Sequence, residues 1–230
     1  MIFKKIVGLL LASTLLFSNT LNFGANQIQS NIQVPQKKTY AELLNALKTS
    51  PSGEHSFYLA MIYLKGMNTP DEEGKIINKD ISLAKKYFNK SISLGYYNAA
   101  QILGSLYLYN EDFSKEENHI NKALSLLKLA LSKGLYEGTT ALADIYINHK
   151  NEPAKGIEYL KLGATHNIPT AQLFLAILYN WGYNSKNYSL KKDPYTAQAL
   201  LTQACTNKNI TENVKNFCSS KNVKINKKKE

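Results

Sequence analysis

Residues 175–179 read Leu-Ala-Ile-Leu-Tyr, and the same order of a large, a small and an aromatic residue begins at Leu59, Leu103 and Leu142. A Leu and the Tyr four positions later lie on one face of an α-helix, and a small residue beside the Leu lets another helix approach closely. Each copy is therefore predicted to be the first helix of a packed pair. The residues given this structural role are Leu59, Ala60 and Tyr63; Leu103, Gly104 and Tyr107; Leu142, Ala143 and Tyr146; and Leu175, Ala176 and Tyr179.

A second pattern follows each motif after a variable polar stretch. Small residues seven positions apart enclose two bulky ones, as in residues 84–91 and 123–130. This spacing predicts a second helix that docks tightly on the first. Gly95, Gly134 and Asn167 follow the second helices, and each residue tolerates the left-handed conformation that ends a helix.

These units resemble Sel1-like repeats, which are relatives of tetratricopeptide repeats. Residues 59–66 and 175–182 match the family pattern Leu-Gly-x-x-Tyr-x-x-Gly, with Ala in place of the first Gly. The third copy departs most, with a very short inner loop and Gly156 where the family has Ala. Unequal spacing of the copies also sets them apart from tetratricopeptide repeats, which stay near about 34 residues. The resemblance implies an all-α fold, an α-solenoid of helix-turn-helix repeats forming a short right-handed superhelix.

The amino terminus has the layout of a secretory signal. Lys4 and Lys5 precede an apolar run over residues 6–17, and small and polar residues follow. The run is shorter than the roughly 20 apolar residues of a membrane-spanning helix, so we expect cleavage, no integral membrane span afterwards, and a periplasmic or secreted protein. Further on, Thr39 and Glu42 form a predicted capping box at the start of a helix.

The chain divides as follows: 1–25, signal peptide and leader; 26–54, polar stretch and N-terminal helix; 55–208, four repeats (about 55–97, 98–137, 138–168 and 169–208); 209–220, C-terminal capping helix; 221–230, lysine-rich tail.

Cys205 and Cys218 are the only cysteines. Export would place them in an oxidising compartment, where an even number of cysteines usually pairs, so we expect a disulfide. Two unpaired buried thiols are the alternative. The chain resembles cysteine-rich exported members of the family, and that resemblance implies a bridge from the last repeat to the closing helix.

The formal net charge is +11, and every basic residue is Lys. Without Arg the chain lacks the planar guanidinium group that binds phosphate and guanine through bidentate hydrogen bonds, so nucleic-acid binding is disfavoured. The lysine-rich tail is expected to be solvated, and weak contact with an anionic envelope surface is the alternative.

Some cysteine-rich relatives bind or hydrolyse β-lactams, and Ser82, Ser125 and Ser189 each begin a Ser-x-x-Lys pattern. The companion motifs Ser-Asp-Asn and Lys-Thr-Gly are missing. The four histidines, His55, His119, His149 and His166, are scattered without metal-ligand spacing. We therefore expect no catalytic residue, no cofactor and no metal.

Helical-hairpin arrays expose a concave surface lined by their first helices. Helical geometry places on that surface the positions two before, two after, five after and six after each motif Leu. They line either a partner groove, with Tyr109 and Trp181 as anchors, or the packing between repeats. The groove residues are Phe57, Met61, Leu64, Lys65, Gln101, Ser105, Leu108, Tyr109, Thr140, Asp144, Ile147, Asn148, Leu173, Ile177, Asn180 and Trp181.

The function predicted from this pattern is an exported protein–protein interaction scaffold of the bacterial cell envelope that binds a peptide or protein in its concave groove. One alternative is a β-lactam- or peptidoglycan-directed enzyme, and another is a secreted effector that meets a host protein.

Overall fold

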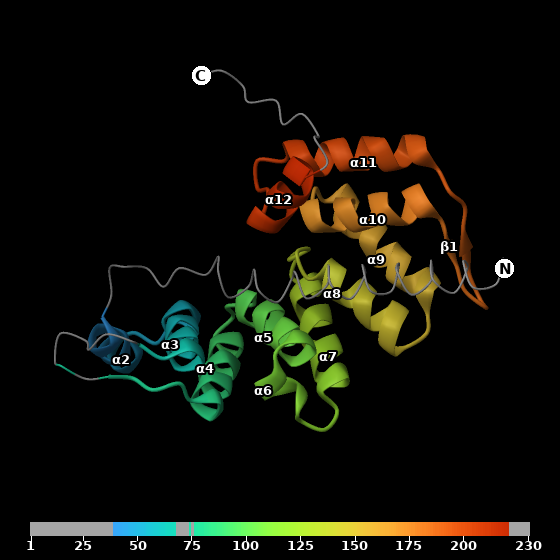
Figure 1. Cartoon of the computed structure of the whole chain (residues 1–230). Helices are drawn as coiled ribbons and strands as arrows, with labels where there is room; N and C mark the ends of the chain where they lie inside the picture. The colour runs from blue at the N-terminus through green and yellow to red at the C-terminus, as the bar shows by residue number, and fades with distance from the viewer. Residues whose placement is uncertain (1–38, 68–73, 75, 221–230) are drawn as a thin grey trace, which may run out of the picture. The chain divides into compact units, whose positions relative to one another are not determined.

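The computed structural model describes residues 39–67, 74 and 76–220. The predicted signal segment, the polar stretch before Thr39 and the lysine-rich tail lie outside these residues. Within them the chain is built from helices and one two-stranded ribbon, as Figure 1 shows. They fall into two compact units, which we call the first unit, ending at Gly138, and the second unit, beginning at Thr139. The expected all-α fold of helical hairpins is confirmed.

The first unit contains two hairpins preceded by one helix. Its helices are α2 (Tyr40–Thr49), α3 (Gly53–Lys65), α4 (Ile81–Ser93), α5 (Asn98–Tyr109), α6 (Glu111–Ser114) and α7 (His119–Ser132). Helix α3 packs against α4, and α5 packs against α7. The predicted capping box opens α2, where the Glu42 N–H donates to Thr39 Oγ1 at 3.2 Å and the Thr39 N–H donates to Glu42 Oε2 at 2.7 Å.

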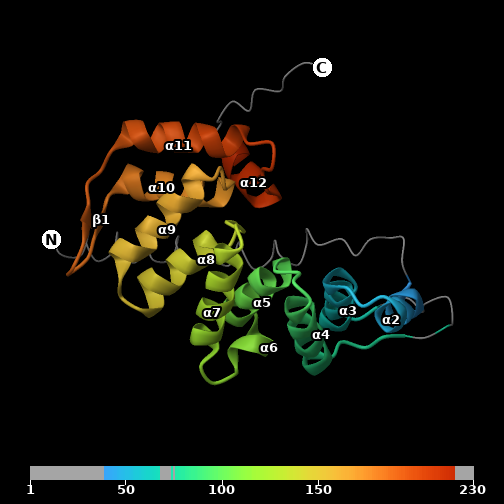
Figure 2. The ribbon, with the colours of Figure 1, turned by 180° about the vertical axis from the view of Figure 1, so that it is seen from behind.

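The second unit contains two further hairpins and a closing helix. Its elements are α8 (Thr139–Asp144), the π-helical η1 (Ile145–His149), α9 (Pro153–Thr165), α10 (Pro169–Trp181), β1 (Tyr183–Asn184), β2 (Ser189–Leu190), α11 (Pro194–Thr206) and α12 (Glu212–Ser220). Helix α8 and η1 form the first helix of one hairpin and pack on α9, while α10 packs along α11 (Figure 2). Helix α12 contacts both α10 and α11.

The repeat motif supplies the core of each hairpin. Each motif Leu and each small residue after it is buried. The motif Tyr of the first hairpin, Tyr63, stacks on Tyr87 with ring centroids 5.5 Å apart. Tyr146 stacks in the same way on Tyr159 of α9, at 5.3 Å. The conserved order of side-chain sizes in the four copies therefore has a packing origin.

One backbone hydrogen bond recurs in the first, third and fourth hairpins, although their inner loops differ. The N–H of the residue before the second helix donates to the carbonyl of the motif Tyr at 2.8 Å in the pairs Asp80–Tyr63, Glu152–Tyr146 and Asp193–Tyr179. This bond fixes the two ends of the inner loop, so the residues between them are free to differ in number and structure. In the fourth hairpin they form the β1–β2 ribbon, with Tyr183 paired to Leu190. The second hairpin instead contains α6.

The second helices end as expected. Gly95, Gly134 and Asn167 have φ of 84°, 79° and 58°, which is the left-handed region. After the first of them, the Tyr96 N–H donates to the Ser91 carbonyl at 3.1 Å, a bond that satisfies a carbonyl at the helix end.

Candidate functional site

Three of the predicted groove positions of α3 are buried. We call the side of each first helix that carries these positions its inner face. Phe57, Met61 and Leu64 are 4%, 0% and 4% exposed. The Phe57 ring lies 6.0 Å from that of Phe88 in α4 and 5.2 Å from that of Tyr96, measured between centroids. The burial of all three contradicts the prediction that they line a partner groove, and Phe57 packs against α4 and the turn leading to α5. Both ring contacts of Phe57 lie within residues 55–97, so they are packing inside the first predicted repeat.

Helix α5 keeps three inner-face side chains partly accessible. Gln101, Leu108 and Tyr109 are half-buried. Ser105 is buried, and its Oγ donates to the Gln101 carbonyl of the same helix at 3.0 Å. An amide, an aliphatic and an aromatic side chain therefore lie along one helix with part of each surface open.

The first helix of the third hairpin is mostly closed. Thr140 is half-buried and shares a hydrogen bond of 3.4 Å with the hydroxyl of Thr170. Asp144 is 5% exposed and accepts a hydrogen bond from the Asn148 amide at 2.5 Å. Ile147 is also buried, since its side chain lies over Gly156 of α9. Assigning Asp144 and Ile147 to an exposed groove is wrong.

Helix α10 is covered over part of its length. Leu173 is 4% exposed and belongs to a buried cluster with residues of α11 and α12, and Ile177 packs against that cluster. Leu173 is therefore also a packing residue. Asn180 and Trp181, at the C-terminal end of the helix, are exposed.

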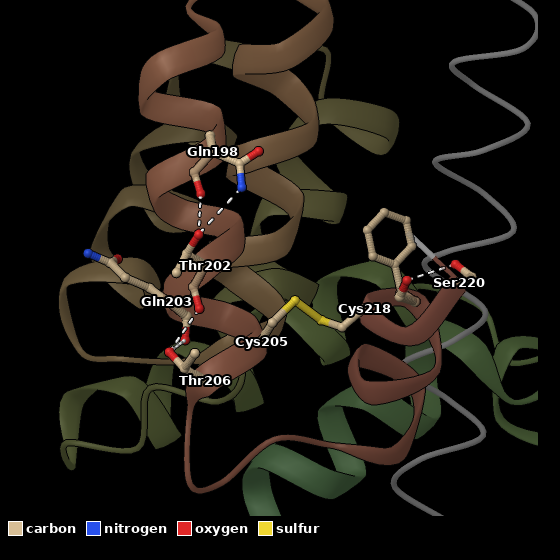
Figure 3. The surroundings of a disulfide bond; sticks show 8 residues. Gln198, Thr202, Gln203, Cys205, Thr206, Cys218 and Ser220 are labelled. Atoms are coloured by element: carbon tan, nitrogen blue, oxygen red, sulfur yellow. Dashed lines mark hydrogen bonds between the residues drawn. A yellow bond between two sulfur atoms is a disulfide. The ribbon is translucent and has the colours of Figure 1, made fainter. Parts of the chain in front are cut away.

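The two cysteines form a disulfide that joins α11 to α12. Figure 3 shows the bridge between Cys205 and Cys218, whose Cα atoms are 5.8 Å apart. Both residues are almost completely buried, with Val214 and Ala204 in the same cluster. The bridge holds α12 over the inner face of α10.

A charged cluster in the first unit was not predicted. Lys85 of α4 and Lys122 of α7 both form ion pairs with Glu116, the second at 2.7 Å. Hydrogen bonds from the two ammonium groups lower the pKa of Glu116 to about 2. Lys85 Nζ also lies 4.7 Å from the ring centroid of Phe113 in α6. Burial, together with the Glu116 carboxylate, raises the pKa of Tyr107 to about 12.

This cluster joins the first hairpin to the inner loop of the second. A nearby pair, Lys79 with Asp112 at 2.6 Å, makes the same connection at a more exposed place. Sequence gave little signal for either contact, because Lys85 and Glu116 are 31 positions apart and belong to different repeats. The charged groups of this cluster are therefore paired with one another, and the pairs made by Lys79 and Lys85 connect the two hairpins.

The three Ser-x-x-Lys serines have ordinary surface environments. Ser82 is exposed on α4. Ser125 Oγ donates to the Lys122 backbone carbonyl at 3.0 Å, and Ser189 Oγ donates to Asn184 Oδ1 at 2.5 Å. Within residues 39–67, 74 and 76–220, no three His, Cys, Asp or Glu side chains gather in a way that would hold a metal ion. Over the same ranges, no helix combines the length and apolar character needed to cross a membrane.

Comparison with solved structures finds similar helical-repeat folds. The chain is similar to a Sel1 repeat protein from Oxalobacter formigenes, with 21% identity and a TM-score of 0.58 over 74% of this chain and 62% of that one. It is also similar to c5321, a protective antigen of uropathogenic Escherichia coli strains that displays an SLR fold, with 19% identity and a TM-score of 0.54 over 78% of this chain and 34% of that one.

The sequence matches no family model and no curated protein. The chain spans less than two thirds of the length of either solved structure. At these identities the likeness concerns the fold, and it shows that the chain has the Sel1-like repeat fold.

Proposed function

We propose that this protein is an exported scaffold of the bacterial cell envelope that binds a peptide or protein partner along the inner face of α5. The observation that supports the proposal is the set of half-buried side chains Gln101, Leu108 and Tyr109 on that helix, beside the buried core residues Leu103 and Tyr107. Aromatic and aliphatic side chains held on a rigid helix lose little conformational freedom when a partner covers them. A neighbouring amide adds directional hydrogen bonds at the edge of such a contact.

Site-specific photo-crosslinking tests the α5 surface. Leu108 is replaced by p-benzoylphenylalanine, and the matched control carries the same residue at Ser125, which is exposed on α7 of the same hairpin. Both proteins are irradiated in cells that make the full chain. We expect one protein adduct that forms from position 108 and is absent from position 125. Equal adducts at both positions, or none at position 108, would contradict the proposal.

The envelope location is the second part of the proposal and rests on the signal-like amino terminus. Fractionation into cytoplasm, periplasm, membranes and medium tests it. We expect the shortened protein, with the first residues removed, in the periplasm or the medium. A full-length protein confined to the cytoplasm would overturn this part and would leave the α5 surface to be judged by crosslinking alone.

A further inference from the structure

The end of the fourth hairpin, where α10 stops and α11 starts, exposes two large aromatic side chains. Trp181 is the last residue of α10 and is 63% exposed, and Tyr195 is the second residue of α11 and is 90% exposed. They are the two most exposed large hydrophobic side chains among the described residues. Indole and phenol rings combine an apolar body with a polar tip, a combination typical of surfaces that meet a boundary between water and an apolar phase.

Backbone contacts hold this end together. The Asp193 N–H donates to the Tyr179 carbonyl at 2.8 Å, joining the last turn of α10 to the residue before α11. The β1–β2 ribbon connects the two helices at the same end and is visible beside them in Figure 1. Trp181 and Tyr195 are therefore presented from one end of one hairpin, 14 positions apart in sequence.

The same end carries unpaired positive charge. Lys186, Lys191 and Lys192 are exposed, and no described acidic side chain forms an ion pair with them. The one carboxylate in this segment, Asp193, caps α11: its Oδ1 accepts the Thr196 N–H at 3.1 Å and its Oδ2 accepts the Thr196 hydroxyl at 2.6 Å. The segment from Trp181 to Tyr195 thus carries three lysines and one carboxylate, a net charge of +2, and no ion pair is formed by the three lysines with a described residue.

The surroundings favour a broad surface over an enclosed ligand. A peptide lying along the inner face of α10 from Trp181 would meet α12, which packs over Leu173 and Ile177. A pocket needs walls around its anchoring side chain, and at 90% exposure Tyr195 has none. A lipid surface needs no pocket, because headgroups rearrange around exposed rings and lysines.

We propose that Trp181, Lys186, Lys191, Lys192 and Tyr195, which we call the α10–α11 end, dock the protein on an anionic lipid bilayer. The aromatic rings enter the headgroup layer and the lysines contact anionic headgroups. This inference is independent of the partner surface on α5 and stands or falls without it.

Trp181 is the only tryptophan in the chain, so tryptophan emission of the full chain reports the α10–α11 end alone. The emission is measured with vesicles of phosphatidylcholine and with vesicles of equal parts phosphatidylcholine and phosphatidylglycerol. We expect a blue shift with the mixed vesicles only, reversed by high salt because screening weakens attraction between exposed charges. Replacing the lysines in a Lys186→Gln, Lys191→Gln, Lys192→Gln variant should lower the partition coefficient about 100-fold, since one lysine near an anionic surface contributes about a factor of five.

The matched control is a Lys86→Gln, Lys90→Gln, Lys161→Gln variant, which loses the same charge from exposed positions elsewhere. It should keep the shift. Equal weakening in both variants would mean that net charge alone drives binding and would overturn the proposal. So would vesicle sedimentation without a change in Trp181 emission, which assigns binding to another segment. A blue shift produced by soluble heparin or polyglutamate but not by mixed vesicles would also overturn it, in favour of a polyanionic glycan or an acidic peptide.

Discussion

Gly156 is the position where one added methyl group should reveal most about the third hairpin. The equivalent residues of the other second helices are Ala84, Ala123 and Ala197, whereas α9 has glycine. A Cβ at Gly156 would lie 2.5 Å from Ile147 Cγ1 and 2.8 Å from the Ala143 carbonyl oxygen. Both distances are far below van der Waals contact, so Gly156→Ala requires α9 to move away from its partner helix.

The expected cost follows from two opposing effects. Overpacking of a closed interface costs about 1–3 kcal/mol, while replacing glycine by alanine inside a helix contributes about 1 kcal/mol of stability. Ile147 can change rotamer, but the Ala143 oxygen belongs to the backbone of the facing helix and cannot. We therefore expect Gly156→Ala to lower the free energy of unfolding of the second unit by up to about 2 kcal/mol.

Native-state hydrogen exchange of the α9 amides, together with urea unfolding followed by circular dichroism, measures this loss. The double variant Gly156→Ala, Ile147→Ala isolates the contact, since Ile147→Ala removes Cγ1 and creates space. We expect the double variant to lose about 1 kcal/mol less than the sum of the single variants. A stabilised Gly156→Ala protein, or strictly additive losses, would refute the argument that close approach of α9 to Ile147 requires glycine.

Three further perturbations test other contacts. Changing both Cys205 and Cys218 to Ala should lower the free energy of unfolding by about 3 kcal/mol, because the bridge closes a loop of 13 residues. Urea unfolding of the wild type in strong reductant should then match urea unfolding of the variant. Ser91→Ala removes the buried 2.6 Å hydrogen bond to the Gly53 carbonyl and should lower the free energy of unfolding by about 1–3 kcal/mol. The control, Ser93→Ala at the exposed surface, should change stability little. Thermal unfolding of the two variants measures the difference. The pKa of Glu116 is lowered from 4.5 to about 2 in the folded protein, so the stability it contributes is complete above about pH 4.5 and is lost as pH falls toward 2. Urea midpoints of the wild type and Glu116→Gln, measured from neutral pH downward, should therefore converge over this range, and a constant difference would contradict the assignment.

The sequence predicted the hairpins well because their determinants are local. A motif Leu, its small neighbour and the Tyr four positions later lie within about one turn of helix, so their spacing alone identifies a face. The helix ends are local as well, since Gly95, Gly134 and Asn167 carry their conformational preference in their own chemistry.

The inner loops and the charged cluster were not predictable in the same way. Short polar stretches of similar composition became α6 in one hairpin and the β1–β2 ribbon in another. Both loops connect helix ends already fixed by the hairpin, so their local structure depends on the neighbours that they meet. Glu116 illustrates this dependence, because its two lysine partners come from α4 and α7.

The prediction of the inner face used the correct helix geometry. It did not take into account the other segments that cover a helix. Counting positions from the motif Leu separates the side facing the second helix from the opposite side, and it assumes that the opposite side meets solvent. In the first hairpin Tyr96, from the segment leading to α5, packs against that side at Phe57. In the fourth hairpin α12 does so at Leu173 and Ile177, held there by the disulfide. Trp181 lies beyond the covered stretch at the C-terminal end of α10 and is 63% exposed, so the assumption that this side meets solvent holds at Trp181 and fails at Leu173.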